Sequence, residues 1–201
     1  MPKEVTPLVI VNNFSKFLEK NNLVNQIEKR GNKGFVDSSF ELMMKKVGWV
    51  SGQAWCAYYV KLVFMQMLSF DRDFLVKNIT GGAANNFYAI QSLNKKGDKR
   101  YLAMNSGLPQ VGDIFCQGVS GNGHTGIVIE ILGGNKVKTI EGNTNLKGSR
   151  EGDRVLSLTR DLTIGGLSQG KKNIGFIRRN FTPQEIEKLE YDEAKQTFIL
   201  K

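Results

Sequence analysis

The sequence contains few of the residues that hold metals or disulfides: one histidine and two cysteines among 201 residues. The cysteines, Cys56 and Cys116, form no C-x-x-C pair, which argues against a disulfide-stapled scaffold. A single histidine cannot complete the usual zinc ligand sets. We therefore expect neither a metal nor another cofactor.

Long apolar runs are also missing. No stretch approaches 18 consecutive apolar residues, which argues against a transmembrane helix. The first residues, MPKEVTPLVIVNNFSKF, include a short apolar stretch but lack the long apolar core and the small-residue cleavage site of a signal peptide. We expect synthesis in the cytoplasm without a signal peptide, and any export by another route.

Acidic residues are outnumbered, because 28 lysines and arginines face 19 aspartates and glutamates, which gives a net charge of +9. Such an excess favours an anionic partner, which could be nucleic acid, cell wall or lipid, although it also serves plain solubility. The basic residues occur in scattered pairs such as Lys45-Lys46 and Arg178-Arg179, without a run of five like charges. A defined nucleic-acid site is therefore not expected.

The first half of the chain is predicted to be helical. Apolar residues recur at helical spacing in four segments: residues 8–29, with a break at Asn21-Asn22, and residues 38–48, 54–70 and 80–93. The second segment opens with a capping box, Ser38 followed by Glu41, and stops at Gly48. Residues 54–70 are apolar nearly all round, which predicts a central buried helix.

The second half consists of short segments rich in β-branched residues: GDIFCQG, HTGIVIEIL, NKVKTIEGN, RVLSLTR and NIGFIRR. The sequence LGGNK joins two of them as a hairpin turn. Thr182, Pro183 and Glu185 then mark the start of a short helix. Helices followed by an antiparallel sheet predict an α+β fold.

Cys56 and His124 are the first candidates for chemistry. Cys56 lies in the first turn of the predicted buried helix, where free N–H groups and the helix dipole favour a negatively charged sulfur. The alternative is a buried structural cysteine. His124 begins a strand directly after the glycine-rich loop GVSGNG, which is a suitable place for a base. The alternative is a surface histidine without a role.

A hairpin about Gly133-Gly134 would bring His124 next to polar residues of the following strand. Residues whose numbers sum to about 267 would face each other, so 124 lies opposite roughly 143, and 126 opposite roughly 141. A bulge can shift this register, so either Glu141 or Asn143 could hold the imidazole. The alternatives are a solvated strand end for Glu141 and a turn residue with positive φ for Asn143.

The segments GQAWCAYYVKLVF, PQVGDIFCQ, GHTGIVIEI and TIEGNTN, in this order, resemble the CHAP domain. This family comprises cysteine, histidine-dependent amidohydrolases/peptidases related to papain-like and NlpC/P60 hydrolases. The resemblance covers about residues 50–180 and implies a papain-like fold, with the cysteine helix packed on an antiparallel sheet. It implies Cys56 as the nucleophile, His124 as the base and Glu141 as the residue that orients the imidazole, with Asn143 as a fourth polar member or the orienter itself.

Further residues receive roles beside this set. Gln53 and Trp55 are expected to bind substrate or help form an oxyanion hole, for which the backbone N–H of Cys56 is the safer donor. Asp113 is expected to brace a turn at the start of the first core strand. Cys116 is expected to be buried in a strand.

The activity that the resemblance implies is hydrolysis of amide bonds in bacterial peptidoglycan, as an N-acetylmuramoyl-L-alanine amidase or a stem or cross-bridge endopeptidase. A phage lysin, a virion hydrolase or a delivered toxin would act in the periplasm or on the cell wall after holin release, virion delivery or injection. The expected partners are peptidoglycan and the anionic envelope, and an immunity protein or virion component. The alternatives are a same-fold cysteine hydrolase acting on a protein or small amide, and an inactive CHAP-like wall-binding module.

The predicted organisation is one catalytic domain with short extensions. Residues 1–35 form an N-terminal helical extension, residues 36–181 the CHAP-like catalytic domain, and residues 182–201 a C-terminal helical tail. No internal repeat is evident, and DRD at residues 71–73 is only a fragment of a calcium-binding loop.

Overall fold

The computed structural model describes residues 14, 16–119, 122–146, 152–168, 170–195 and 197–201. Within these ranges the helices are α2 (Ser38–Lys46), α3 (Cys56–Met67), α4 (Arg72–Asn78), α5 (Ala83–Lys95) and α6 (Pro183–Lys188), with a 3-10 turn η1 at Ser69–Asp71. The strands are β1 (Tyr101–Met104), β2 (Ile114–Val119), β3 (Asn122–Gly133), β4 (Lys136–Thr144), β5 (Arg154–Asp161), β6 (Leu167–Ser168), β7 (Lys171–Arg179), β8 (Leu189–Asp192) and β9 (Thr197–Leu200).

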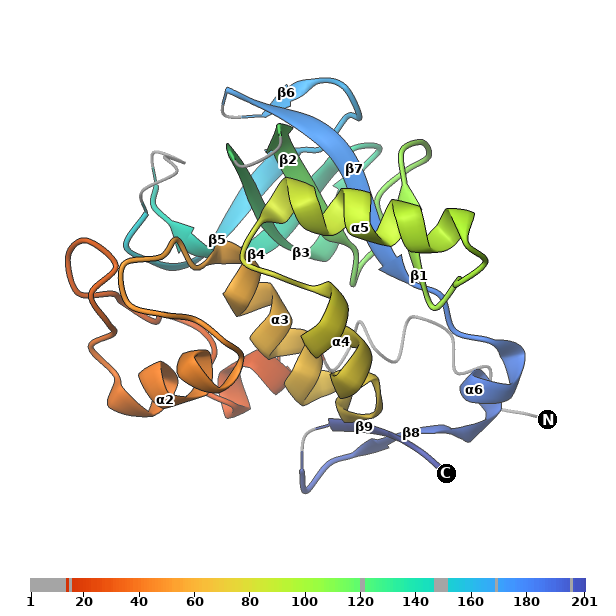
Figure 1. The fold of residues 1–201 in the computed structure, drawn as a ribbon, viewed down its shortest axis with the longest axis horizontal. Helices are drawn as coiled ribbons and strands as arrows, with labels where there is room; N and C mark the ends of the chain where they lie inside the picture. Colours follow the sequence, from red (N-terminus) through yellow and green to blue (C-terminus); the bar gives the residue numbers. More distant parts are fainter. Residues whose placement is uncertain (1–13, 15, 120–121, 147–151, 169, 196) are drawn as a thin grey trace.

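Strands β1 to β7 form one antiparallel sheet in the order β1-β7-β2-β3-β4-β5, with β6 paired to β7 outside this path. Strands β8 and β9 form a separate hairpin. In Figure 1, α5 lies across the sheet, while α3 directs its first turn toward β3 and β4. The fold is therefore α+β, as the sequence predicts, and it is consistent with a papain-like arrangement.

The sheet separates two apolar cores because side chains alternate between its faces. Strand residues that join the helices in the main core are Ile114, Ile127, Ile140 and Ile177. Residues of the opposite phase and their neighbours form a second core: Phe115, Val128, Val137, Leu162 and Phe176. His124 and Glu141 share the phase of the second core, so their side chains start from that face of the sheet.

Helix α3 confirms the predicted central buried helix, although it is shorter than residues 54–70. Ten of its 12 residues are buried. They include Lys61, whose pKa is lowered by burial and whose Nζ donates to the carbonyl of Val76 in α4 (3.5 Å). The helix predicted for residues 80–93 is α5, which begins three residues later than expected.

The N-terminal helix is only partly as predicted. Residues 16–20 are helical, and the chain turns at Asn21-Asn22, where Asn22 has a positive φ of 53°. The predicted continuation to residue 29 is wrong, because Ile27 pairs in an isolated antiparallel bridge with Arg154. Residues 8–13 of the predicted helix lie outside the described residues.

Helix α2 is capped differently from the prediction. Asp37 rather than Ser38 is the N-cap, and its carboxylate accepts from two backbone N–H groups of the first turn. Glu41 accepts instead from the N–H of Phe35, outside the helix (3.0 Å). An ionised aspartate is a strong acceptor at the positive end of a helix, which explains why it displaces the adjacent serine. Gly48, with φ of 97°, follows the helix end as predicted.

The five predicted strands are confirmed as β2, β3, β4, β5 and β7. The β3–β4 hairpin has the predicted register at Ile127 with Ile140 and at Val128 with Thr139, where both pairs sum to 267. Two bulges between Val128 and Gly133 shift the pairing nearer the turn, so that Gly133 faces Lys136. The turn residues are therefore Gly134 and Asn135 instead of Gly133-Gly134. The short elements η1, α4, β1 and β6 are too brief to produce a clear periodic signal, and the sequence did not predict them.

The C-terminal tail is helical only at its start. Helix α6 begins with the predicted capping box of Thr182 and Glu185 and with Pro183 in its first turn. The chain then forms the β8–β9 hairpin in place of further helix. The Thr197 hydroxyl donates to the carbonyl of Gln66 at the end of α3 (2.7 Å), which satisfies one of the carbonyls that a helix end leaves free.

A buried ion-pair network fastens α6 to the sheet. Arg179, at the end of β7, donates to Asp71 (2.6 Å) and to Glu185 of α6 (2.7 Å). The Tyr101 hydroxyl donates to the same carboxylate of Asp71 (3.0 Å). Asp71 belongs to the DRD sequence, and its side chain here holds elements together.

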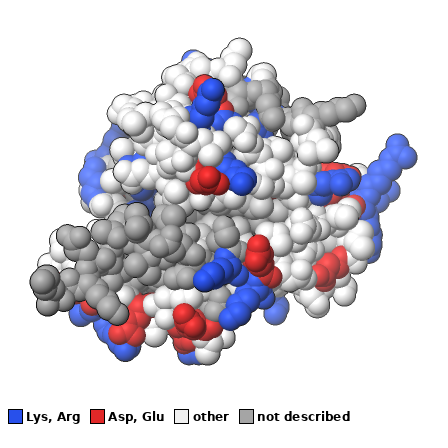
Figure 2. Space-filling model, turned by 180° about the vertical axis from the view of Figure 1, so that it is seen from behind, with Lys and Arg blue, Asp and Glu red and all other residues white. Residues whose placement is uncertain are grey.

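The excess positive charge is dispersed. On the face shown in Figure 2, Lys and Arg side chains are interspersed with Asp and Glu, and the described residues form no continuous basic area there. Exposed ion pairs contribute to this mixing, such as Lys45 with Glu41 (2.6 Å) and Lys201 with Glu190 (2.6 Å). None of the helices in the described part of the chain is long and apolar enough to cross a membrane.

Candidate active site

Cys56 is the first residue of α3, and Trp55 occupies the N-cap position. The first N–H groups of a helix have no partner within the helix, so this position offers donors and the positive end of the helix dipole. Cys56 is 4% exposed, so its side chain reaches the surface only slightly. Its predicted place in the first turn of the buried helix is confirmed.

His124, on β3, contacts side chains from two other elements. Its Nε2 lies 2.8 Å from Oε2 of Glu141 on β4, and the Cys56 side chain of α3 lies close enough to the ring to contribute to the raised pKa of the imidazole. Because Nε2 bonds to Glu141, Nδ1 is the nitrogen that remains for the sulfur. The structure therefore brings a thiol, the single imidazole and a carboxylate into one chain of contacts.

Glu141 is surrounded by donors. Arg160 of β5 donates from Nε to Oε1 and from Nη2 to Oε2, the latter at 2.5 Å. The hydroxyl of Thr139 donates to Oε1 (2.6 Å). The side chains of Glu141, Arg160 and His124 are all at most 2% exposed. Bidentate contact with an arginine fixes the plane of the carboxylate as well as its position.

The surroundings shift the protonation of both partners. Burial alone would lower the pKa of His124, but hydrogen bonds to Cys56 and Glu141 outweigh it and raise the pKa to about 9. Burial alone would raise the pKa of Glu141, but the hydrogen bonds from Arg160 and then His124 hold it at about 2. At neutral pH the site therefore holds an ionised carboxylate against an imidazolium.

The segment that contains these residues matches a known family. The family model of the CHAP domain matches residues 48–143, which include Cys56, His124 and Glu141. The chain carries a CHAP domain. CHAP domains are hydrolases of the amidase and peptidase class, so the match implies a hydrolase activity for this segment. Searches of curated proteins and of solved structures gave no significant match.

The imidazole–carboxylate pair of the CHAP domain predicts a pH-dependent stability. The lowered pKa of Glu141 contributes stability above its ordinary value of 4.5, which is lost as pH falls toward 2. The raised pKa of His124 contributes stability below 6.5, which is lost as pH rises toward 9. We expect the free energy of unfolding to fall by on the order of 2–3 kcal/mol between pH 6.5 and 9. Denaturant unfolding across this range measures the slope, and His124→Gln should flatten it.

Three glycines of the CHAP motifs are required by close packing. A Cβ on Gly126 would lie 2.6 Å from Cγ of Glu141, so this glycine leaves room for the carboxylate opposite. A Cβ on Gly142 would lie 2.6 Å from the Trp55 ring, and one on Gly123 would lie closer still to the carbonyl oxygen of Gln117 on β2. Gly142 thus lets the first turn of α3 approach the sheet, and Gly123 leaves room for the backbone of the neighbouring strand.

Gly126→Ala should destabilise the CHAP domain and displace Glu141. The new methyl would also lie 2.7 Å from the Ile140 carbonyl and 2.8 Å from the Phe115 ring, and neither neighbour has free space. Overpacking of this kind costs about 1–3 kcal/mol, to be measured by denaturant unfolding. Gly166→Ala is the comparison variant, because its closest contact, 3.0 Å to the Thr163 carbonyl, is tight but less severe than those at Gly126. An equal loss in both variants would contradict the steric explanation.

Asn143 is buried, whereas Gln53 is exposed. Asn143 is buried in β4 and has the positive φ predicted for it, 54°. The contact with the imidazole comes from Glu141. Gln53 is exposed and accepts from the Tyr58 hydroxyl (2.9 Å). Its part in an oxyanion hole, and that of Asn143 beside the imidazole, stay predictions.

Trp55 lies in the core instead of at the surface. Its side chain is 0% exposed and packs edge-on against Phe35 and Tyr59. Its indole N–H donates to Glu28 (2.5 Å). This placement gives the indole no exposed surface with which to contact a substrate, and we assign Trp55 a packing role in place of the predicted substrate-binding one.

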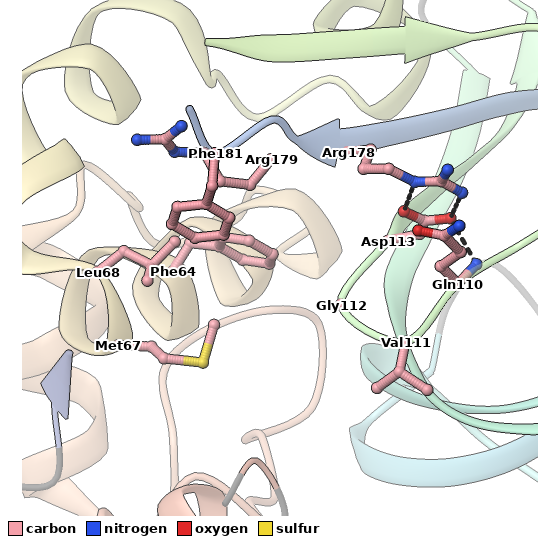
Figure 3. Close-up of a pocket in the computed structure, with 10 residues that line it drawn as sticks. All are labelled: Phe64, Met67, Leu68, Gln110, Val111, Gly112, Asp113, Arg178, Arg179 and Phe181. Atoms are coloured by element: carbon pink, nitrogen blue, oxygen red, sulfur yellow. Dashed lines mark hydrogen bonds and ion pairs between the residues drawn. The ribbon is translucent and has the colours of Figure 1, made fainter. Parts of the chain in front are cut away.

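A pocket of about 60 Å³ lies at the other end of α3 from Cys56, between Phe64, Leu68 and the loop before β2 (Figure 3). The charged side chains that line it are already paired. Asp113 accepts from Nη2 of Arg178 (2.7 Å) and from the N–H of Gln110 (2.7 Å). Asp113 thus braces this turn, as predicted, and the pocket adds no group to the site.

Cys116 is buried in β2, as predicted. Burial raises the pKa of its thiol to about 12. The two cysteines therefore occupy different environments, because Cys56 contacts an imidazole at a helix N-terminus and Cys116 packs in the main core.

Arg160, which binds Glu141, is the residue of this cluster that sequence reasoning missed. It lies beyond the CHAP match and far along the chain from Cys56 and His124. One signal was present, since Leu156, Leu158 and Arg160 alternate on one side of the predicted strand RVLSLTR. A charged residue in the inward phase of a strand requires a buried partner.

Proposed function

We propose that this chain is a cysteine hydrolase that cleaves amide bonds of bacterial peptidoglycan. The observation that carries the proposal is the chain of contacts from Cys56 to His124 to Glu141, with the sulfur at the N-terminus of a helix. A nucleophile, a base and a group that orients the base are the requirements for covalent acyl transfer.

The reaction would proceed in two steps. The Cys56 thiolate attacks the carbonyl carbon and a C–S bond forms. The carbonyl oxygen becomes negatively charged and accepts hydrogen bonds from N–H groups at the start of α3. His124 gives its Nδ1 proton to the leaving amine as the C–N bond breaks. His124 then takes a proton from water, whose oxygen attacks the thioester and releases the acid and the thiol. Glu141 holds the ring through Nε2 in both steps.

Peptidoglycan is the proposed substrate class because amide cleavage in the cell wall is the common activity of CHAP domains. A net charge of +9 suits an anionic envelope. The setting that we propose is a phage lysin, a virion hydrolase or a delivered toxin, acting in the periplasm or on the wall. An immunity protein or a virion component would be the protein partner in two of these settings.

Digestion of purified sacculi tests the proposal. The protein should release soluble fragments, and mass spectrometry should show which bond is cut. A free L-alanine amine identifies muramoyl amidase activity, whereas a new amine within the stem or bridge identifies an endopeptidase. Binding to sacculi without release of fragments would indicate an inactive wall-binding module. If the protein hydrolysed small amides or peptides but left the sacculi undigested, the same reaction would act on a substrate other than peptidoglycan.

A further inference from the structure

Arg160 is a buried cation that donates to both carboxylate oxygens of Glu141. It lies near the end of β5, opposite Val137 of β4, and its side chain is 1% exposed. Its guanidinium also lies over the Phe115 ring of the second core, 5.6 Å from the ring centre. Burying a charge is costly unless a partner compensates it, and the partner here is Glu141.

The two oxygens of the Glu141 carboxylate share the surrounding donors evenly. Each oxygen accepts one donor from Arg160 and one from another residue: Thr139 at Oε1 and His124 at Oε2. The planar fork of an arginine can satisfy two oxygens at once, which a lysine cannot do. The orientation of Oε2 toward the imidazole is therefore fixed from behind by the guanidinium.

We infer that Arg160 is a positioning residue that keeps Glu141 ionised and holds its Oε2 against Nε2 of His124. The inference rests on the proposed function of Cys56, His124 and Glu141. Arg160 acts through Glu141 and does not itself meet the substrate.

The charges at the site explain the need for this residue. The groups that face Glu141 are His124 from β3 and Arg160 from β5, while Cys56 from α3 faces His124. The carboxylate of Glu141 is thus held between two cations, the imidazolium and the guanidinium. Without the guanidinium, the buried carboxylate would lose its bidentate partner, and burial would favour its protonated form. A protonated Glu141 would no longer stabilise the imidazolium.

Carbon-13 NMR of the Glu141 carboxyl tests the inference without any substrate. In the wild type we expect no titration above about pH 3, because the pKa of Glu141 lies at about 2. In Arg160→Met we expect the pKa to rise by at least about one unit, since the burial cost remains and the strongest partner is gone. Glu141→Gln assigns the signal. Arg160→Lys, which keeps the charge without the fork, should give a smaller rise and is the second variant if Arg160→Met does not fold.

Kinetics on sacculi provide the second readout. Arg160→Met should lower kcat/KM by roughly 10- to 100-fold, the equivalent of one hydrogen bond to a charged group, with the larger loss at acidic pH. In a Glu141→Gln background the same change should cost much less, because no carboxylate is left to orient. A loss that is uniform with pH and additive to Glu141→Gln would reduce Arg160 to a structural role and overturn the inference.

The two proposals fail in different ways. If the protein hydrolyses no peptidoglycan but the Glu141 titration moves in Arg160→Met, the proposed substrate is wrong and the positioning role stands. If the wild type is active but the carboxyl titration is the same in folded Arg160→Met and Arg160→Lys, the inference about Arg160 is wrong.

Discussion

Cys56→Ala is expected to lower the rate of peptidoglycan hydrolysis by about 10⁴-fold or more, because it removes the atom that forms the acyl-enzyme. The fold should tolerate the change, since alanine is smaller and favours a helix. The measurement is the release of soluble fragments from purified sacculi, with circular dichroism to compare the folds. A variant that lysed sacculi at the wild-type rate would end the proposal that this sulfur is the nucleophile.

The second cysteine offers a matched control for that experiment. Cys116→Ala removes a thiol whose pKa is raised to about 12 and which packs in the main core. It should retain most of the activity and lose some stability. The same contrast should appear on alkylation: iodoacetamide should modify Cys56 at mildly acidic pH and leave Cys116 unmodified while the protein is folded. Equal labelling of both thiols would contradict the assignment.

His124→Gln is expected to cost about 10³-fold or more in kcat, because glutamine can donate a hydrogen bond to Glu141 but cannot carry a proton between amine and water. His124 is the single histidine of the chain, so no neighbouring imidazole can replace it. The loss should appear at every pH at which the wild type is active. Turbidity loss of sacculi suspensions and fragment release both measure it.

Non-additivity provides the sharper form of this test. Groups that act as one unit lose most of their effect when any one is removed, so Cys56→Ala with His124→Gln should be hardly slower than Cys56→Ala alone. Alkylation of Cys56 at acidic pH should also slow in His124→Gln, because the imidazolium that favours the thiolate is gone. If the fold-loss in the double variant equalled the product of the losses in the two single variants, the residues would act independently. That result would contradict the proposed chain of contacts.

The sequence was sufficient to predict that His124 meets either Glu141 or Asn143. A glycine-rich turn indicated the approximate hairpin register, and an alternation of period two indicated the face of each side chain. The choice between Glu141 and Asn143 was left open because a one-residue shift would exchange them. The folded backbone gives Asn143 the positive φ that the sequence had raised as one alternative.

The rest of the site depends on contacts between distant segments. Trp55 looked like a residue of the binding surface because it precedes Cys56, but its burial follows from Phe35 and Glu28, which belong to a segment without a family match. Arg160 lies beyond the matched segment, and its partner is fixed only when β5 pairs with β4. Local patterns carry no information on such pairings.

The helix that bears Cys56 is secured by both ends of the chain. Glu28 binds the indole just before its first turn, and Thr197 binds a carbonyl in its last turn. The family match at residues 48–143 contains neither of them, nor the strands β5 and β7 that flank β4 and β2. A fragment trimmed to that match would expose two unpaired strand edges and an open apolar core. The segment by which the family is identified is therefore shorter than the smallest part of this protein that we expect to fold on its own.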